Sequence, residues 1–340
     1  MNLNEQYYRK IMSAIGFALL IFLLLFNIFG VVISLILPMV LHAALPNAPI
    51  AYDVIYQLSY AAGYLASFMV PVAFLKLFIK KAGFPYRPMN APLQISPWLP
   101  LIALSCVSLV FVFSYLNSVI MELLGGYPDF LFQLPEEEDV PPGVYHWVLE
   151  FIAVCMVPGF CEEFLFRGAI LTNCLPFGRG NAIFISALLF SFMHQNPAQI
   201  LYTFAAGILL GLVYERTGSI WNCVLLHIFN NFVATVETML STAIRDSVML
   251  SLCIDLLELA IFILGLLSAV ILITRFFAKG KTRVENGFFG RALPACNDYA
   301  PIPVEAQRVR RLFLAPSMLA FLILATLQIG LILFYAVVFK

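Results

Sequence analysis

Long apolar stretches, separated by short polar interruptions, make up most of this chain. A helix needs about 20 apolar residues to cross the hydrocarbon core of a bilayer. By that measure the pattern predicts about nine membrane-spanning helices. They are expected near residues 11–41, 57–79, 97–121, 147–175, 181–195, 199–215, 219–240, 249–277 and 313–339. Because the fifth and sixth stretches are short, eight spans with one re-entrant segment is the alternative interpretation.

The composition supports a membrane protein. Hydrophobic residues make up 62% of the chain and charged residues 11%, and the mean hydropathy is +0.95. Soluble globular proteins are typically about 45–50% apolar and about 25% charged. We therefore predict an all-α, polytopic transmembrane helix bundle. Lys plus Arg equals Asp plus Glu at 19 each, so no net charge suggests nucleic acid as a partner.

The positions of the basic residues predict the orientation. If the amino terminus is cytoplasmic and nine spans alternate, almost every Lys and Arg in the connecting segments falls on the cytoplasmic side, and only Arg245 and Lys340 fall outside. This is the positive-inside bias of membrane proteins. We therefore predict a multi-pass protein with a cytoplasmic amino terminus.

Two loops divide the chain into three expected parts. An outer loop at about 122–146 contains the acidic run Pro135–Asp139 and no Lys or Arg, which is typical of a solvated loop. An inner loop at about 278–312 is basic and interrupted by prolines, which is typical of a flexible connector. The parts are the amino-terminal spans with the acidic loop (1–146), a central core (147–240) and the carboxy-terminal spans joined by the basic loop (241–340).

The sixth apolar stretch carries small residues at four-residue spacing. They are Thr203, Gly207 and Gly211. Small residues so spaced let two helix backbones approach closely. We expect this stretch to pack tightly inside the bundle.

Three short segments place ionisable and polar side chains inside the apolar stretches. They are Glu162–Arg167, Phe190–His194 and His227–Asn231. An ionisable group at membrane depth costs about 2.5–3.5 kcal/mol on insertion scales, so such groups usually mark function and face the bundle interior. Of only four histidines in the chain, two lie in these segments. The pattern therefore indicates a functional site.

The first segment distributes its charges over two helix faces. Glu163 and Arg167 are four residues apart with the acid first, the better orientation for an intrahelical ion pair. Glu162 lies about 100° around the helix from Glu163 and has no cation close in sequence. We predict Glu162 as a general base, with Glu163 and Arg167 as structural support. The alternative is that both acids belong to a charge cluster at a helix end.

Spacing along the chain tests whether the segments can meet. Glu162 precedes Gly178 by 16 residues and His194 follows it by 16, so two antiparallel helices would bring them to one level. His227 is expected roughly 9 Å shallower at a rise of about 1.5 Å per residue, unless helix tilt removes the difference. Phe190 shares a helix face with His194, so we expect its ring beside that imidazole.

This set of groups suits hydrolysis. A carboxylate and an imidazole can deprotonate a water molecule, while a second imidazole and the amide of Asn231 stabilise the oxyanion formed at a carbonyl. Alternatively, Glu162, His194 and His227 could bind Zn²⁺ and leave one coordination position for water. Their wide spacing gives no metal signature, and neither HExxH nor GxSxG occurs. We therefore favour a mechanism without a cofactor.

The motifs resemble those of a known family. Glu-Glu-x-x-x-Arg, Phe-x-x-x-His and His-x-x-x-Asn, in this order, are similar to the core of the type II CAAX prenyl endopeptidase and bacteriocin-processing (CPBP) family of intramembrane proteases. The resemblance covers about residues 147–240. It implies Glu162 and His194 as the water-activating pair, and His227 and Asn231 as the oxyanion-stabilising pair.

The resemblance also suggests a setting and a substrate class. Many members of this family lie in bacterial plasma membranes, so that membrane is the expected location. The expected substrate is a peptide, or a lipidated peptide or protein, within the bilayer.

Two other functions are alternatives to a protease. A non-catalytic binding or regulatory membrane protein, of the self-immunity type found in this family, would have no need of Glu162 and His194 together. A proton-coupled transporter also places acids and histidines in the membrane, but it predicts broken helices in corresponding halves, and the sequence has no such symmetry. Both alternatives are testable by replacing Glu162.

Overall fold

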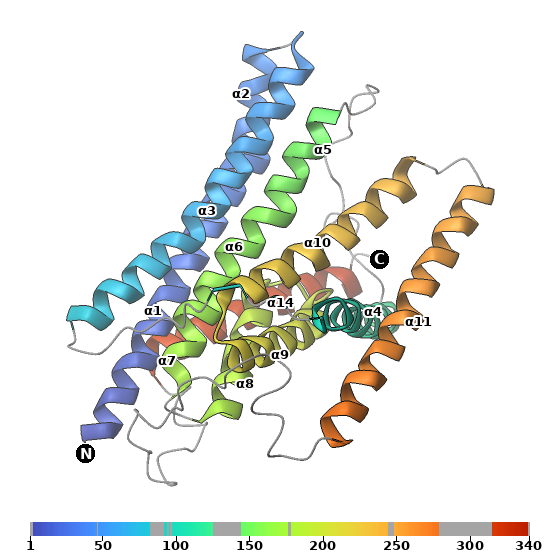
Figure 1. Cartoon of the computed structure of the whole chain (residues 1–340). Coiled ribbons are helices and arrows are strands. Elements are labelled where there is room, and N and C mark those ends of the chain that lie inside the picture. Colours follow the sequence, from blue (N-terminus) through green and yellow to red (C-terminus); the bar gives the residue numbers. More distant parts are fainter. Residues whose placement is uncertain are drawn as a thin grey trace.

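Each of the predicted apolar stretches coincides with a helix (Figure 1). The computed structural model describes residues 3–45, 47–81, 92–93, 95, 97–124, 144–175, 178–243, 248–278 and 315–338. Every regular element in these ranges is helical, which confirms the all-α class. The acidic run Pro135–Asp139 and the basic loop predicted at 278–312, from residue 279 on, lie outside the described residues.

The helices follow one another with short connections. Before the central core they are α1 (Leu3–Val31), η1 (Val32–Ile36), α2 (Leu37–Ala44), α3 (Pro49–Lys81) and α4 (Leu99–Leu123). The core contains α5 (Val144–Glu150), η3 (Phe151–Met156), α6 (Val157–Glu163), η4 (Phe164–Leu171), α7 (Thr172–Cys174), α8 (Arg179–Met193), α9 (Ile200–Thr217) and α10 (Ile220–Ala243). After it come α11 (Val248–Ala278) and α14 (Pro316–Val338).

Seven helices within the described ranges are long and apolar enough to cross a membrane. The protein is therefore an integral, multi-pass membrane protein. Helix α8 is not among the seven because it has only 15 residues, fewer than the roughly 20 that the hydrocarbon core requires. The helical run from Val144 to Cys174 is also not among them, and it contains three buried charged side chains.

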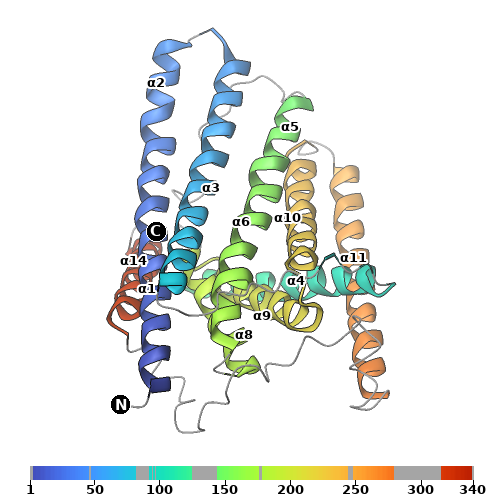
Figure 2. The ribbon, with the colours of Figure 1, turned by 60° about the vertical axis from the view of Figure 1, so that its left-hand side comes forward.

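The helices do not share one axis. Helices α1 and α3 lie side by side, and α3 continues beside α5 and α6 (Figures 1 and 2). Helix α4 lies crosswise to α11 in both views, and α14 crosses α1. The close α4–α11 crossing depends on Gly265, because a Cβ there would lie 2.3 Å from the Leu104 carbonyl oxygen.

The small residues of α9 pack closely against α8. A Cβ at Gly207 would lie 2.8 Å from the Ala187 Cα, and one at Gly211 would lie 3.1 Å from Ile183 Cγ2. Thr203, one turn earlier, is buried. The tight packing predicted for this stretch is thus confirmed, and α8 and α9 both contact η4, which directly follows α6.

The central helical run from Val144 to Cys174 is interrupted by two π-helical segments, η3 and η4, on either side of α6. Such segments are rare and occur frequently at functional sites. Pro158 lies between them and has no N–H to donate to the carbonyl of Val154, four residues earlier. Next to it, Gly159 lets α10 approach, since a Cβ there would lie 2.6 Å from Ile228 Cγ1.

Candidate active site

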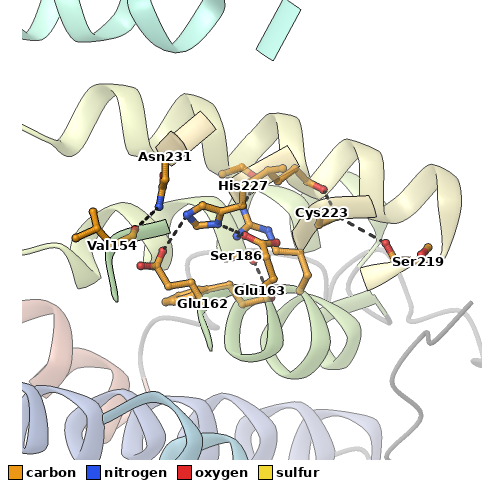
Figure 3. Close-up of polar contacts among 12 residues, drawn as sticks. Val154, Glu162, Glu163, Ser186, Ser219, Cys223, His227 and Asn231 are labelled. Atoms are coloured by element: carbon orange, nitrogen blue, oxygen red, sulfur yellow. Dashed lines mark hydrogen bonds and ion pairs between the residues drawn. The ribbon is translucent and has the colours of Figure 1, made fainter. Parts of the chain in front are cut away.

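Glu162 and Glu163 end helix α6 in the interior of the protein. Their exposed fractions are 3% and 0%. Helix α10 lies close to α6 at this level, and its His227 side chain reaches both carboxylates (Figure 3). The two acids were expected to face different partners, and the structure instead places one imidazole between them.

Glu163 connects Arg167 to His227. Its Oε1 lies 2.7 Å from Arg167 Nη1 and 2.7 Å from His227 Nδ1. The ion pair with Arg167 that the spacing predicted is therefore present, and both of its side chains are fully buried. The sequence did not indicate the second bond, by which Glu163 orients His227 as well as neutralising Arg167.

Arg167 is also held by two neutral groups. Its Nη2 donates to the Gly207 carbonyl oxygen at 3.3 Å. Its Cζ lies 4.7 Å from the centroid of the Phe190 ring, a cation–π distance. A buried guanidinium therefore meets a carboxylate, a carbonyl and an aromatic face, which is how buried charges are tolerated.

The bond to Glu163 determines how His227 presents its other nitrogen. A carboxylate only accepts hydrogen bonds, so we assign the proton to Nδ1. Nε2 then points to Glu162, whose Oε2 lies 3.8 Å away. That oxygen is buried and has no hydrogen-bond partner within the described ranges. An unpaired carboxylate oxygen and an imidazole nitrogen thus face one another.

Glu162 has a partner on its other oxygen. The hydroxyl of Tyr64, on α3, donates a hydrogen bond to Glu162 Oε1. Tyr64 is 98 residues away in sequence and lies outside the three motifs. The contact makes the two oxygens of Glu162 chemically different, since one is hydrogen bonded and the other is not.

His194 follows the last residue of α8, and the Phe190 ring lies close to both imidazoles. The ring centroids of Phe190 and His194 are 5.0 Å apart, and those of Phe190 and His227 are 6.1 Å apart. Phe190 therefore lies beside the His194 imidazole, as its shared helix face predicted. Within the described part of the chain, no hydrogen bond joins the His194 ring directly to Glu162.

The segment after His194 is held by α4 and by α8. Asn117 donates to the Pro197 carbonyl at 3.1 Å and accepts from the Leu201 amide at 3.1 Å. Ser191 donates to the Ile200 carbonyl at 2.8 Å. Gln195, directly after His194, has a φ of 52°, a left-handed conformation that non-glycine residues adopt at a cost. These bonds offset that cost and define where His194 lies.

Asn231 lies one turn after His227 on α10 and turns its amide toward the central helix (Figure 3). Its Nδ2 donates to the Val154 carbonyl oxygen at 3.2 Å. That carbonyl lacks its α-helical donor because residue 158 is proline. The bond orients the amide, whose nitrogen carries a second hydrogen.

The three segments therefore converge on one location. His227 lies at the level of Glu162 and Glu163, since it contacts both. The difference in depth of roughly 9 Å, which follows from a rise of about 1.5 Å per residue, assumed upright helices. Helix α10 is inclined to the central helix in Figure 1, which accounts for the difference.

The zinc alternative required Glu162, His194 and His227 to share one ion. Among the described residues, no three His, Cys, Asp or Glu side chains are placed so that they could hold a metal ion. This arrangement does not fit the expected zinc ligand set, so we derive the chemistry from the side chains alone.

Two polar residues at the site were not predicted. Tyr64 belongs to a row of aromatic residues on α3, where the spacing suggests packing only. Asn117 is an isolated amide in an otherwise apolar stretch, and it is 2% exposed. The one signal in the sequence was that a polar group at membrane depth is costly, and this applied to Asn117 more clearly than to Tyr64.

The central part of the chain matches a known protein family. The model of type II CAAX prenyl endopeptidase Rce1-like proteins matches residues 144–233. Comparisons with curated proteins and with solved structures give no match. The matched segment runs from α5 into α10 and includes the three motifs, whereas Tyr64 and Asn117 lie outside it.

Proposed function

Residues 144–233 belong to the type II CAAX prenyl endopeptidase Rce1-like family, and from this premise we propose that the chain is an intramembrane endopeptidase in which Glu162 activates water. The match confirms the family that the motifs predicted, and it supports a protease of the CAAX type in the membrane. The catalytic roles of individual residues are our proposal.

One observation carries the mechanism. Glu162 Oε2 and His227 Nε2 lie 3.8 Å apart. Two atoms at that separation can both bind one water molecule at ordinary hydrogen-bond distances of about 2.8 Å. The carboxylate oxygen has no other partner within the described ranges, so it is available to accept a proton from that water.

The reaction then proceeds by direct attack. Glu162 Oε2 takes one proton from the water as its oxygen bonds to the carbonyl carbon of the substrate, and the carbonyl oxygen becomes an oxyanion. When the C–N bond breaks, the proton held by Glu162 passes to the leaving amine. The products are a new carboxylic acid, which keeps the second proton of the water, and a new amine, and the enzyme carboxylate is regenerated.

The remaining polar groups surround this reaction. His227 is held through Nδ1 by Glu163 and presents Nε2 to the water. His194, beside Phe190, and the second amide hydrogen of Asn231 are the candidate donors to the oxyanion. The resemblance implied the opposite use of the two imidazoles, with His194 beside the base. The closeness of His227 to Glu162 supports His227 as the imidazole that binds the water.

The proposed substrate is a peptide segment inside the bilayer. Helix α6 carries the base between apolar helices, so the scissile bond must reach membrane depth. A lipid attached close to that bond would supply such an anchor, and the matched family is described as a CAAX prenyl endopeptidase. We therefore propose a peptide or lipidated peptide as substrate.

The proposal is tested with the purified full-length protein in lipid vesicles. The probes are a peptide ending in a prenylated cysteine followed by three residues, and the same peptide without the lipid. We expect the prenylated peptide to lose its last three residues, and Glu162→Gln to lower the rate by about 10²–10⁴-fold, the usual contribution of a general base. A Glu162→Gln protein that retains the wild-type rate on a cleaved probe would refute the role of Glu162.

Removing metals tests the choice of a cofactor-free mechanism. We expect dialysis against a strong chelator to leave the cleavage rate unchanged, because the mechanism uses only side chains. Loss of activity that added Zn²⁺ restores, but Mg²⁺ does not, would replace this mechanism by a metal-dependent one.

A further inference from the structure

Tyr64 contacts the proposed base from a helix outside the region that matches the family. Its hydroxyl donates to Glu162 Oε1, while Glu162 Oε2 is the oxygen that faces His227 Nε2. We propose, resting on the function above, that Tyr64 is a positioning residue: it binds one oxygen of Glu162 and so directs the other toward the attacking water.

Aromatic contacts hold the Tyr64 ring. It stacks on Phe68 with centroids 4.8 Å apart and planes at 22°. Phe26, on α1, meets it edge-on at 6.0 Å, and the ring of Tyr60 lies 6.0 Å away on the other side. Two helices therefore restrict the ring, and a tyrosine has only two side-chain torsions to restrict. The position of the Tyr64 hydroxyl beside Glu162 Oε1 is therefore well defined.

A carboxylate without this contact would have no defined orientation. Glu162 has several rotatable bonds, and no cation bonds it directly, because Arg167 binds Glu163. The other oxygen of Glu162, Oε2, lies 3.8 Å from His227 Nε2. The Tyr64 hydroxyl is thus the one direct hydrogen bond that Glu162 side-chain oxygens receive from the described residues. It decides which oxygen is left to accept a proton.

The proposal extends the active site beyond the matched segment. Residues 144–233 supply the base and both imidazoles, but α3 supplies the group that orients the base and α1 supplies part of its aromatic support. Helices α1 and α3 therefore contribute to catalysis through the position of Tyr64, in addition to packing against the core.

The first test separates the hydroxyl from the ring. Tyr64→Phe keeps the aromatic contacts and removes the hydrogen bond, whereas Tyr56→Phe makes the same change about 12 Å earlier on the same helix. We expect Tyr64→Phe to lower kcat by about 10- to 100-fold, the usual effect of losing a hydrogen bond to a charged group, with KM within about twofold of wild type. Tyr56→Phe should leave both parameters unchanged.

The second test does not depend on activity. Dicyclohexylcarbodiimide enters membranes and modifies buried carboxyl groups, and its product at Glu162 can be quantified by peptide mass spectrometry. Tyr64→Phe uncovers Glu162 Oε1, so we expect faster labelling of Glu162 than in wild type or in Tyr56→Phe. Labelling of Glu163 should not change, because Arg167 and His227 still occupy its Oε1.

The two readouts distinguish the failure of each claim. Faster Glu162 labelling in a protein that cleaves no probe supports the contact and counts against the proposed function. Equal labelling and equal kcat in Tyr64→Phe and Tyr56→Phe would overturn the positioning role. Phe68→Leu provides a second variant if Tyr64→Phe does not accumulate: it loosens the ring and should lower kcat by a smaller factor, about 2- to 10-fold.

Discussion

Two clusters of one histidine and two carboxylates lie at different heights of this protein, and they differ in burial. His146, on α5, lies 2.9 Å from Asp53 Oδ2 and 3.4 Å from Glu150 Oε2. His227 lies 2.7 Å from Glu163 Oε1 and 3.8 Å from Glu162 Oε2. The side chains of the first cluster are 14–26% exposed, and those of the second are 0–8% exposed.

The difference distinguishes a partly exposed ion-pair cluster from the cluster that we propose to be catalytic. At His146, both ring nitrogens lie close to carboxylate oxygens, and all three side chains are partly exposed. At His227, the nearer carboxylate, Glu163, forms an ion pair with Arg167, and the farther one, Glu162, accepts a hydrogen bond from Tyr64. Both clusters combine one imidazole with two carboxylates. Of the two clusters, only the second contains buried carboxylate oxygens without a hydrogen-bond partner, and one of these, Glu162 Oε2, is the proposed base.

Replacing the two histidines should give the largest contrast. We expect His227→Gln to lower kcat by about 10²–10⁴-fold, because an imidazole beside the water is lost. His146→Gln should keep the wild-type kcat. The measurement is cleavage of the probe peptides by the two variants at equal protein concentration. Equal losses in both variants would show that the His146 cluster is also part of the catalytic apparatus.

The buried ion pair of Glu163 should differ from a surface ion pair in stability. Arg167→Met leaves the Glu163 carboxylate buried without its cation, which should cost about 3–5 kcal/mol of unfolding free energy. Arg179, which pairs with Glu215 at 2.8 Å, has a half-exposed side chain, so Arg179→Met should cost about 1 kcal/mol or less. Denaturant titration of the purified variants in micelles measures both values.

A double variant sharpens this result. Glu163→Gln combined with Arg167→Met removes both charges, so part of the lost stability should return. Activity should not return, because His227 Nδ1 no longer has a carboxylate to orient it. Recovery of activity along with stability would contradict the role given to Glu163.

The approach of α10 to α6 should tolerate little added volume. Gly159→Val places carbon atoms where Ile228 lies, and overpacking of this kind costs about 1–3 kcal/mol. The variant should also lower activity, because it pushes His227 away from Glu162. Adding Ile228→Ala should restore part of both. Gly180→Ala, where nothing lies within 4 Å of the new Cβ, is the control and should behave like wild type.

The helices were predictable because hydropathy marks membrane segments directly. The residues at which the helices begin and end were less predictable. Helix α3 begins at Pro49 instead of near residue 57, since Asp53 and Gln57 are polar but remain helical. Hydropathy locates the part of a helix that lies in apolar surroundings, and polar residues at its end do not stop the helix.

Most residues of the site were predictable from the sequence, but most of the hydrogen bonds between them were not. Helical spacing placed Glu163 with Arg167 and Phe190 with His194, because both pairs lie close together along the chain. The bond between Glu163 and His227 depends on the tilt of α10 and on Gly159, neither of which a one-dimensional pattern contains. Tyr64 reaches Glu162 from another helix, so no local spacing could indicate it.

The most direct test compares protein termini in membrane fractions from cells that express wild type or Glu162→Ala at equal levels. The account predicts new amino and carboxyl termini, from one or a few membrane proteins, that are present only with wild type. Identical termini in the two fractions, together with a wild-type phenotype in the variant, would contradict it and would favour a membrane protein that acts by binding alone.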